Sequence, residues 1–238
     1  MQPYLVFTLA ASLGAMGDLA GHERRGSLSW PGRSAVIGLL GAALGIRRDG
    51  DFSALDALSL AVAVFEDGAP LRDYHTVETV PSAAVNSANS RPEALARAGK
   101  LRTNTTITLR DYRAGALYGV AVWGGDLEAL AEALRTPVFT LYLGRKSCPL
   151  SCPPAPKILR ADTIEAALAM LDLPLWQRRD RQNRPMTARL LVADAGPEDA
   201  HVETRHDSPS DRRLWHFSPR NVAFRSVEIV PNDGVQGA

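Results

Sequence analysis

The chain has 238 residues, with 27 basic and 26 acidic side chains and a hydrophobic content of 45%. That length suits one large or two small domains, and the hydrophobic content is ordinary for a globular protein with a core. Because the charges balance, the chain is not a polycation, and any contact with nucleic acid must come from local clusters of basic residues. Only three basic residues are lysine. Arginine forks bind phosphate in a bidentate way, but a GC-rich genome produces the same bias.

Cysteine content and the lengths of the apolar runs argue against a disulfide-rich domain and against a membrane or secreted protein. Two cysteines, Cys148 and Cys152, cannot form the framework of a disulfide-rich domain. No second ligand pair lies near them to complete a zinc site, so we expect no metal. No apolar run approaches the length of a membrane span, and the apolar N-terminus lacks the basic region of a signal peptide. We therefore expect a cytoplasmic protein without membrane contact.

Hydrophobic periodicity predicts the elements of the first 143 residues. The patterns indicate, in chain order, a strand at Tyr4–Ala10, a long loop at Ala11–Gly32, a helix at Ser34–Leu44, strands at Leu60–Phe65, Leu71–Thr79, Thr103–Arg110 and Gly115–Trp123, a helix at Leu127–Arg135 and a strand at Val138–Leu143. Asp126 precedes the second helix and is expected to cap it through its carboxylate.

The stretch Arg24–Gly45 carries the clearest signal for anion binding. Two arginines open it, a turn follows at Pro31, and Ser34 stands where a helix N-cap belongs. A cationic loop over a helix N-terminus suits a phosphate, because free N–H groups and the helix dipole both favour negative charge. The alternative is a plain surface loop that leads into a tightly packed helix.

The segment Pro81–Lys100 differs in composition from its surroundings, being rich in Asn, Ser and Pro without a sustained apolar face. The polar, strand-like segments Asp73–Thr79 and Thr103–Arg110 frame it. Such a pair predicts an extended hairpin that leaves the body of the domain. The alternative is a disordered surface loop.

The order of elements predicts an α+β fold. It runs strand–helix–strand, an excursion, and strand–helix–strand, which is the order of a ferredoxin-like (RRM-like) domain made of two split βαβ units. We expect this domain at residues 1–146, with an inserted β-hairpin thumb at about 79–112. A smaller β-rich C-terminal unit is expected at 147–238, with a helix at Asp162–Leu171 and strands at Ala188–Ala193, Val202–Arg205 and Val222–Val230.

Two basic segments lie in the second half of the chain. Gly144–Lys157 is a Gly- and Pro-rich loop that bears Arg145 and Lys146, directly after the expected fourth strand. Arg178–Arg189 is the most basic stretch and is too polar for a core. Charge runs usually face water, so its plain interpretation is a solvated linker.

Most catalytic motifs are absent from the sequence. The glycines of the first helix form neither a dinucleotide fingerprint nor a P-loop, no serine sits in a nucleophile elbow, and no acidic cluster would hold Mg²⁺. One enzymatic hypothesis remains, in which His75 or Tyr74 abstracts a 2′-hydroxyl proton and Lys146 stabilises the transition state of metal-independent RNA cleavage. A strand histidine paired with a polar neighbour is the commoner situation.

Several motifs together resemble a known family. They are Arg25-x5-Pro31-x-x-Ser34-Ala35-x-x-Gly38-Leu39-Leu40-x-Ala42-Ala43-Leu44-Gly45, Asp73-Tyr74-His75-Thr76, Leu143-Gly144-Arg145-Lys146-Ser147-Cys148-Pro149, and His206-Asp207-x-Pro209 followed by Phe217-x-x-Arg220-x-x-x-Phe224-Arg225. Their order and content resemble the CasD-type RAMP subunits of type I-E CRISPR Cascade complexes. One departure is Met16, where relatives tend to carry an aromatic residue.

This resemblance implies a non-catalytic RNA-binding subunit without a cofactor. Members of the family cap one end of the effector complex and grip the 5′ handle of the crRNA, while a thumb packs across the guide against a backbone subunit. Expected partners are therefore the crRNA, the backbone subunits, the large subunit and, indirectly, the target DNA. Two alternatives stay open: a metal-independent endoribonuclease that processes repeat RNA, and a scaffold whose basic loops bind an acidic protein.

Shape and backbone recognition of the handle would use basic side chains for phosphates and exposed side chains for splayed bases. The expected RNA-binding residues are Arg24, Arg25, Arg33, Ser34, Tyr74, His75, Arg102, Arg145, Lys146 and Ser147. The sequence leaves open whether Trp30 is a stacking platform or a packing anchor, and whether Arg33 pairs locally instead.

Overall fold

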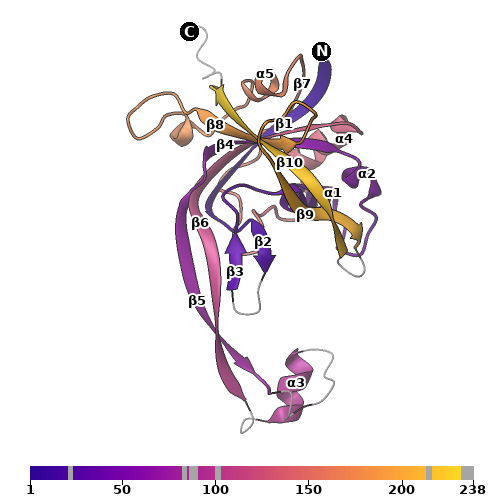
Figure 1. Ribbon diagram of the computed structural model, residues 1–238, viewed down its shortest axis with the longest axis vertical. Helices are drawn as coiled ribbons and strands as arrows, with labels where there is room; N and C mark the ends of the chain where they lie inside the picture. Colours follow the sequence, from indigo (N-terminus) through magenta and orange to yellow (C-terminus); the bar gives the residue numbers. More distant parts are fainter. Residues whose placement is uncertain (21–23, 82–84, 86–90, 100–102, 213–215, 232–238) are drawn as a thin grey trace.

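A computed structural model describes residues 1–20, 24–81, 85, 91–99, 103–212 and 216–231 (Figure 1). Within these residues the chain is an α+β protein in which ten strands form one curled sheet. The strands are β1 (Gln2–Gly14), β2 (Gly17–Ala20), β3 (Arg24–Ser27), β4 (Ser59–Glu66), β5 (Ala69–Thr79), β6 (Asn104–Trp123), β7 (Lys157–Ala161), β8 (Ala188–Asp194), β9 (Val202–Asp211) and β10 (His216–Ile229). The helices are α1 (Arg33–Leu44), α2 (Ser53–Asp56), α3 (Arg91–Ala98), α4 (Leu127–Arg135), α5 (Ile164–Leu168) and the 3-10 turn η2 (Leu175–Gln177).

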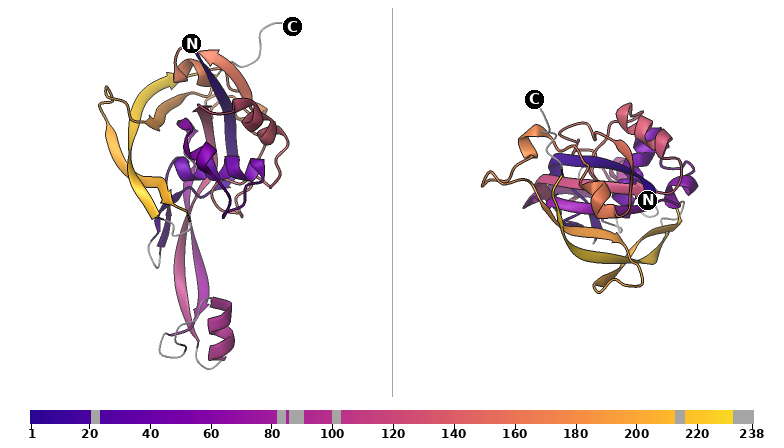
Figure 2. Two further views of the ribbon diagram at one scale, coloured as in Figure 1. Left: turned by 90° about the vertical axis from the view of Figure 1, so that its right-hand side faces the viewer. Right: turned by 90° about the horizontal axis from the view of Figure 1, so that it is seen from above.

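The central strands lie in the order β7-β1-β6-β4, and each neighbouring pair is antiparallel. β8 continues the sheet beside β4, and β10 and β9 follow. The expected C-terminal strands therefore belong to the same sheet as the N-terminal ones, and Figure 2 shows how this sheet curls around the helices.

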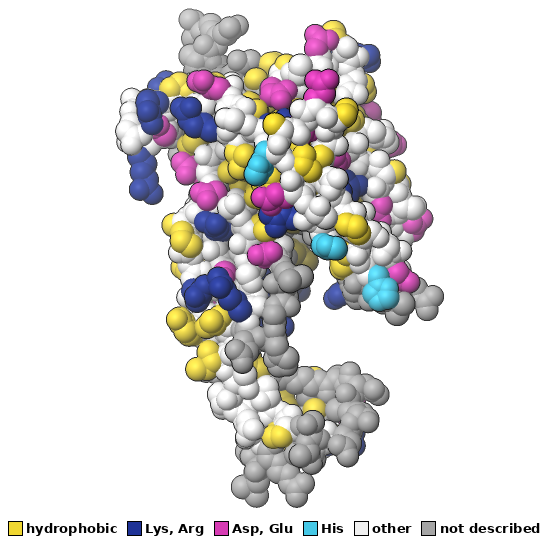
Figure 3. All heavy atoms as spheres, viewed as in Figure 1, with side chains coloured by type: hydrophobic (Ala, Val, Ile, Leu, Met, Phe, Trp, Pro, Cys, Tyr) yellow, Lys and Arg dark blue, Asp and Glu magenta, His cyan; other side chains and the backbone are white. Residues whose placement is uncertain are grey.

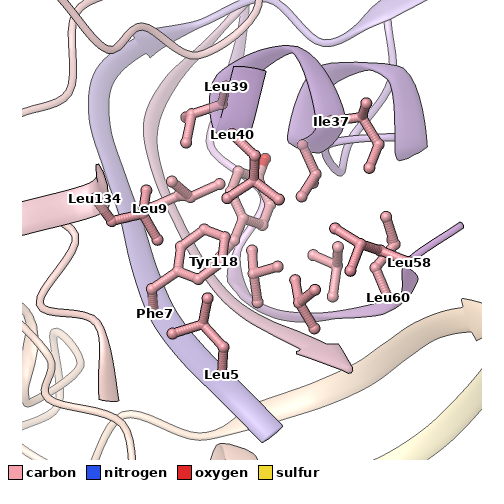
Figure 4. Packing of buried hydrophobic residues seen from close by; sticks show 14 of the residues in the cluster. Leu5, Phe7, Leu9, Ile37, Leu39, Leu40, Leu58, Leu60, Tyr118 and Leu134 are labelled. Atoms are coloured by element: carbon pink, nitrogen blue, oxygen red, sulfur yellow. The ribbon is translucent and has the colours of Figure 1, made fainter. Parts of the chain in front are cut away.

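Apolar side chains fill both faces of the central strands, which is why these strands read as near-continuous apolar runs. On one face Leu5, Phe7 and Leu9 of β1 pack with Leu40 of α1 and Leu134 of α4 (Figure 4). On the other face, alternate residues of the same strand meet α5 and the segment after it. The two-sided burial follows from the period of two in a strand.

The second helix of the sequence analysis is confirmed. α4 spans Leu127–Arg135, and the carboxylate of Asp126 accepts a hydrogen bond from the Ala129 backbone N–H at 3.0 Å. Leu127, Leu130 and Leu134 are buried on its inner face. This helix carries its own start signal and its own apolar stripe, so the sequence defines it locally.

The expected strand at Val138–Leu143 is wrong. The backbone N–H groups of Val138 and Phe139 donate to the carbonyls of Ala43 and Ala42 at the end of α1, which diverts this segment from the sheet. β7 occupies the edge beside β1 instead, with Lys157 opposite Val6. An apolar run forms a strand only where a neighbouring strand offers its backbone groups.

The expected long loop at Ala11–Gly32 is also wrong. β1 continues to Gly14, and β2 and β3 form a small antiparallel pair. β3 then pairs in parallel with β6, with Arg24 opposite Leu109 and Arg25 opposite Arg110. These short strands are mostly polar and are held by backbone pairing, so an apolar pattern in the sequence does not predict them.

An extended antiparallel pair leaves the body of the molecule (Figures 1 and 2). Its strands, β5 and β6, pair from Ala69 opposite Ala114 out to Thr79 opposite Asn104. The expected loop at Pro81–Lys100 contains the helix α3, and the remainder of that loop lies mostly outside the described residues. β5 continues β4 after only Asp67 and Gly68, so the core sheet and the arm share the strand β6.

Gly68 makes this joint possible. Its φ is +76°, and a Cβ there would lie 2.9 Å from the carbonyl oxygen of Ala114. The Arg113 guanidinium donates to the Gly68 carbonyl at 3.2 Å, and the Tyr118 hydroxyl donates to the carbonyl of Asp67 at 3.4 Å. The joint is therefore a defined turn between two ladders.

A carboxylate between β8 and β9 makes folding stability depend on pH. Arg225 donates to both oxygens of Asp199, and the Gly196 N–H also donates to it, which lowers the pKa of Asp199 to about 2. A pKa below the ordinary value stabilises the folded state above about pH 4, and this contribution is lost as the pH falls towards 2. We expect Asp199→Asn to lower the free energy of unfolding at pH 6, with a loss that shrinks towards pH 2, measured by urea unfolding.

The control for this prediction is the Arg225→Gln background. There Asp199 lacks its main hydrogen-bond donor, so Asp199→Asn is expected to show a much weaker pH dependence. An equal dependence in both backgrounds would contradict the assignment to this ion pair.

Candidate nucleic-acid interface

The N-terminus of α1 is capped by backbone, and of the residues around it Pro31, Gly32 and Arg33 are buried while Ser34 is exposed. Gly32 is the N-cap, without a side-chain hydrogen bond, and its carbonyl accepts from the N–H groups of Ala35 and Val36. The expectation that Ser34 caps this helix is wrong, since Ser34 lies inside the first turn with its side chain exposed. In the first turn Ser34 is therefore exposed and Ala35 partly exposed, at the positive end of a twelve-residue helix.

The turn after the expected fourth strand is tightly fixed. Gly144 has a φ of +84°, and a Cβ there would lie 1.8 Å from the carbonyl oxygen of Ala15. Backbone hydrogen bonds join Ala15 to Leu143 at 3.1 Å and Leu143 to Cys148 at 2.8 Å, and the Cys148 side chain is buried. The turn 143–148 is thus pinned against the end of β1, with its central side chains facing outwards.

These two segments meet at one surface. Arg25, Ser34, Gly144 and Arg145 line the same hollow of about 310 Å³. The Arg145 guanidinium donates to the Arg25 carbonyl at 3.3 Å, which joins the β3 strand to the turn directly. The structure therefore brings together four residues that lie up to 120 positions apart in the sequence.

Arg145 is held in place by an aromatic ring. Its guanidinium carbon lies 4.6 Å from the centre of the Tyr112 ring, a favourable cation–π geometry. In the described part of the chain its Nη1 atom is buried without a hydrogen-bond partner. Tyr112 was missed by the sequence analysis, because it is the pairing of β6 with β1, with Arg113 opposite Gly14, that brings it beside the turn.

A larger hollow of about 790 Å³ continues from this surface. Ser34 and Gly38 of α1 form one side, and Lys146 borders it. Its other lining residues include apolar side chains and further arginines, among them Ile37, Phe52, Phe139, Arg47, Arg48, Arg212 and Phe217. Figure 3 shows the charged side chains of the viewed face, which include both signs in many small groups.

Arg33 does not lie where the sequence analysis placed it. Its side chain is almost fully buried, and Nη2 donates to the carbonyls of Asp56 at 2.7 Å and Leu58 at 2.8 Å. Asp194 lies 3.9 Å from its Nη1. The guanidinium ties α1 to the residues before β4, so this arginine pairs locally and is not available to a surface phosphate.

Trp30 is a packing anchor. Its ring is buried and meets Phe224 edge-to-face, with the ring centres 5.8 Å apart. Arg205 lies over the ring at 5.9 Å. The ring fixes β10 against the start of α1 and has no free face for a base.

Arg24 is exposed at the base of the arm and is already paired. Its guanidinium donates to Asp111 at 2.7 and 2.9 Å, and Arg72 donates to the same carboxylate at 2.7 Å. These hydrogen bonds, that of Arg72 foremost, hold the pKa of Asp111 below its ordinary value. A carboxylate shared by two arginines leaves a net positive charge at this position.

Tyr74 and His75 lie on β5, out on the arm. Tyr74 stands opposite Leu109 and is 70% exposed, and His75 stands opposite Thr108 with its Nδ1 4.0 Å from Asp73. Consecutive strand residues point to opposite faces, so these two side chains do not act on one substrate group together. Lys146 lies on the body, beside α1.

The remaining expected residues divide into two cases. Ser147 is exposed in the turn 143–148, next to Lys146. Arg102 lies outside the described residues. In the part of the chain that the structure describes, no group of three or more His, Cys, Asp or Glu side chains could hold a metal ion. None of the described helices combines the length and the apolar character needed to cross a membrane.

Comparisons with known proteins all find CRISPR-associated proteins. The family model described as CRISPR-associated protein (Cas_Cas5) matches residues 4–223. The CRISPR system Cascade subunit CasD of Escherichia coli (strain K12) is 35% identical over 171 residues, which cover 64% of this chain and 70% of that protein.

Solved structures give the same result. A chain of a structure described as a CRISPR RNA-guided surveillance complex superposes with a TM-score of 0.69 at 25% identity, covering 95% of this chain and 91% of that chain. A second structure, described as a crystal structure of a Cas protein, gives a TM-score of 0.68 at 27% identity, covering 96% and 98%.

The turn 143–148 generates a stability prediction. We expect Gly144→Ala to lower the free energy of unfolding by about 2 kcal/mol or more, because the new methyl group clashes with the Ala15 carbonyl and the residue must hold a positive φ. Thermal and urea unfolding measure this. Gly38→Ala is the matched control, since nothing lies within 4 Å of its Cβ position and an exposed helical alanine adds about 0.5–1 kcal/mol. Equal effects of both substitutions would contradict the close packing.

Proposed function

The chain belongs to the Cas5 family of CRISPR-associated proteins, and on this basis we propose that it is a non-catalytic crRNA-binding subunit of a type I-E interference complex, capping the 5′ handle of the guide. The observation that carries the proposal is the meeting of Arg25, the start of α1 and the turn at Gly144 around one hollow. The relative from E. coli is a Cascade subunit, which supports a role in such a complex.

Recognition of the handle uses charge and close backbone approach. Arg25, Arg145 and Lys146 offer cations to phosphates. The bare surface at Gly144 and Ser34 lets the RNA backbone come near the free donors of the helix start. Splayed bases then enter the larger hollow, whose apolar and aromatic lining suits base faces.

We further propose that the central strands form a ferredoxin-like RAMP domain. The order β7-β1-β6-β4 with α1 and α4 supports two split βαβ units. In this proposal β7 is the fourth strand, so the domain extends to Ala161 rather than ending at residue 146, and the smaller β-rich unit follows it.

The arm formed by β5 and β6 is the thumb of this proposal; the sequence analysis expected it at about 79–112, whereas the paired strands begin at Ala69 and end at Ala114. Tyr74 and Ile107 lie on the same face of the arm and are 70% and 55% exposed. Exposed apolar residues on a projecting hairpin suit packing across the guide against a neighbouring backbone subunit. The large subunit and, through it, target DNA are the other proposed partners.

A second candidate function, metal-independent cleavage of repeat RNA, has less support. It requires a base and a cation on one scissile phosphate. His75 and Tyr74 face opposite sides of β5, and Lys146 borders a hollow of the body.

Incubation of the purified protein with repeat RNA in EDTA separates the two functions. We expect binding without a discrete new 5′ end, and the same result for His75→Ala. A specific cleavage product that disappears in His75→Ala or Lys146→Ala would establish the endoribonuclease instead.

Binding of the handle generates the main prediction. The double substitution Arg25→Ala and Lys146→Ala is expected to weaken crRNA affinity and to reduce the slope of log affinity against log salt by about 1.4, since each lost phosphate contact on a single strand removes about 0.7. Filter binding at several salt concentrations measures both values.

The matched control removes two arginines elsewhere on the surface, Arg135→Ala and Arg160→Ala. It keeps the change in net charge and leaves the hollow intact, so we expect wild-type affinity and slope. Equal effects of the two doubles would overturn the site. Nuclease-sensitive copurification of RNA with the wild-type protein would argue against the alternative of a scaffold that binds only an acidic protein.

A further inference from the structure

A group of large apolar side chains is exposed between α5 and β8, on the body of the protein. Leu175 is 76% exposed, Trp176 is 66% exposed, and Met170 is 45% exposed. This segment is the orange loop beside β8 in Figure 1, at the end of the molecule away from α3. Tryptophan and leucine in adjacent positions, both open to water, are costly to leave uncovered.

The segment that follows is ordered, contrary to the solvated linker of the sequence analysis. Arg179 pairs with Pro185 in a β-bridge, and the Met186 N–H donates to the Arg178 carbonyl at 2.8 Å. Asp180 accepts from the Arg184 guanidinium at 2.8 Å and from the Arg184 N–H at 2.9 Å. Residues 178–186 therefore form a small closed hairpin.

Buried residues fix this hairpin to the core on both sides. Leu173 before it and Met186 at its end belong to the cluster under α5. Leu175 and Trp176 lie between these anchors and face outwards. Because this surface is already ordered, it would lose little conformational entropy when a partner binds.

The segment that follows the apolar pair is rich in arginine, although Glu66 and Glu228 line the same hollow as Arg184 and Arg189. Residues 178–189 contain five arginines and one acidic residue, Asp180. Asp180 is engaged by Arg184, whereas Arg181 and Arg189 are exposed and form no ion pair with the described residues. Tryptophan and arginine are the residue types enriched at energetic centres of protein interfaces.

We propose that Leu175 and Trp176, together with the hairpin 178–186, form a protein-docking surface for a partner that presents an apolar pocket edged with Asp and Glu. The charge of the hairpin selects an acidic rim, and the two large side chains fill the pocket. This surface lies outside the proposed RNA site, so the inference does not depend on that site.

Two other occupants fit less well. A second copy of this chain would bring two arginine-rich hairpins together, and like charges at an interface cost several kcal/mol. A nucleic acid would be attracted by the arginines and could stack on Trp176, but the aliphatic side chains of Leu175 and Met170 gain nothing from phosphate or sugar.

Photo-crosslinking of the tagged full-length chain in its own cells tests the proposal. Benzoylphenylalanine replaces Trp176, and in a control chain it replaces Glu128 on the exposed face of α4. We expect a crosslink from position 176, absent from position 128, to a peptide of another protein that carries several Asp or Glu, with a yield that falls as salt is raised. Crosslinks to nucleic acid, to a second copy, or to nothing would each overturn the proposal.

Substitutions then measure the two components of the surface. Trp176→Ala is expected to weaken binding of the crosslinked protein at least about tenfold. Arg181→Glu is expected to weaken it and Arg181→Lys to preserve it. Both side chains are exposed, so the unfolding temperature of all three variants should stay at its wild-type value. Unchanged binding in Trp176→Ala, or binding that increases in Arg181→Glu, would overturn the proposal.

Discussion

The burial of β1 on both of its faces is the constraint on which the rest of the structure depends. Leu5, Phe7 and Leu9 belong to the core under α1 and α4, while Tyr4 and Val6 belong to the core under α5. The strand is also hydrogen-bonded on both edges, to β6 and β7. Its end is therefore fixed in space, and the turn at Gly144 and the β2–β3 pair are built against that end.

Charge in this protein is mostly neutralised where it lies, so the placement of the few open cations matters. Arg24 shares Asp111 with Arg72, Arg33 bonds to backbone carbonyls, and Arg220 bridges Asp194 and Asp207. These arginines hold segments together. A count of basic residues in the sequence cannot separate them from the cations that face a ligand, because the distinction depends on carboxylates far away in the chain.

The sequence predicted best those elements that carry their own signals. α4 has a cap and an apolar stripe, and β1, β4 and β8 have apolar runs that match their two-sided burial. It failed where pairing is decided by a distant backbone, as at β3. The apolar run Val138–Leu143 misled for the same reason, since the end of α1 takes up its N–H groups.

For the candidate site, the sequence identified the two turns that converge, and the structure brings Arg25 and Arg145 together there. The sequence analysis wrongly named Ser34 as the helix cap, and it placed Arg33 among the surface residues expected to bind RNA. The sequence analysis began the helix at Ser34, whereas α1 begins at Arg33 with Gly32 as its N-cap. This shift of one residue changes the directions in which the side chains of Arg33 and Ser34 point. That outcome is set by the tertiary contact of Arg33 with Asp56 and Leu58.

The turn at Asp67 and Gly68 joins the β4–β6 pairing to the β5–β6 pairing, so a change at this turn is amplified along the arm. Its eleven paired residues extend about 37 Å at the usual rise of an antiparallel strand. A change of about 10° in direction at the base would carry the far end through about 6 Å, roughly the spacing of successive nucleotides or of one helical turn. The backbone geometry at Gly68 thus determines the direction of the arm and the position of its far end. A displacement of the far end would in turn change the backbone angles at the base.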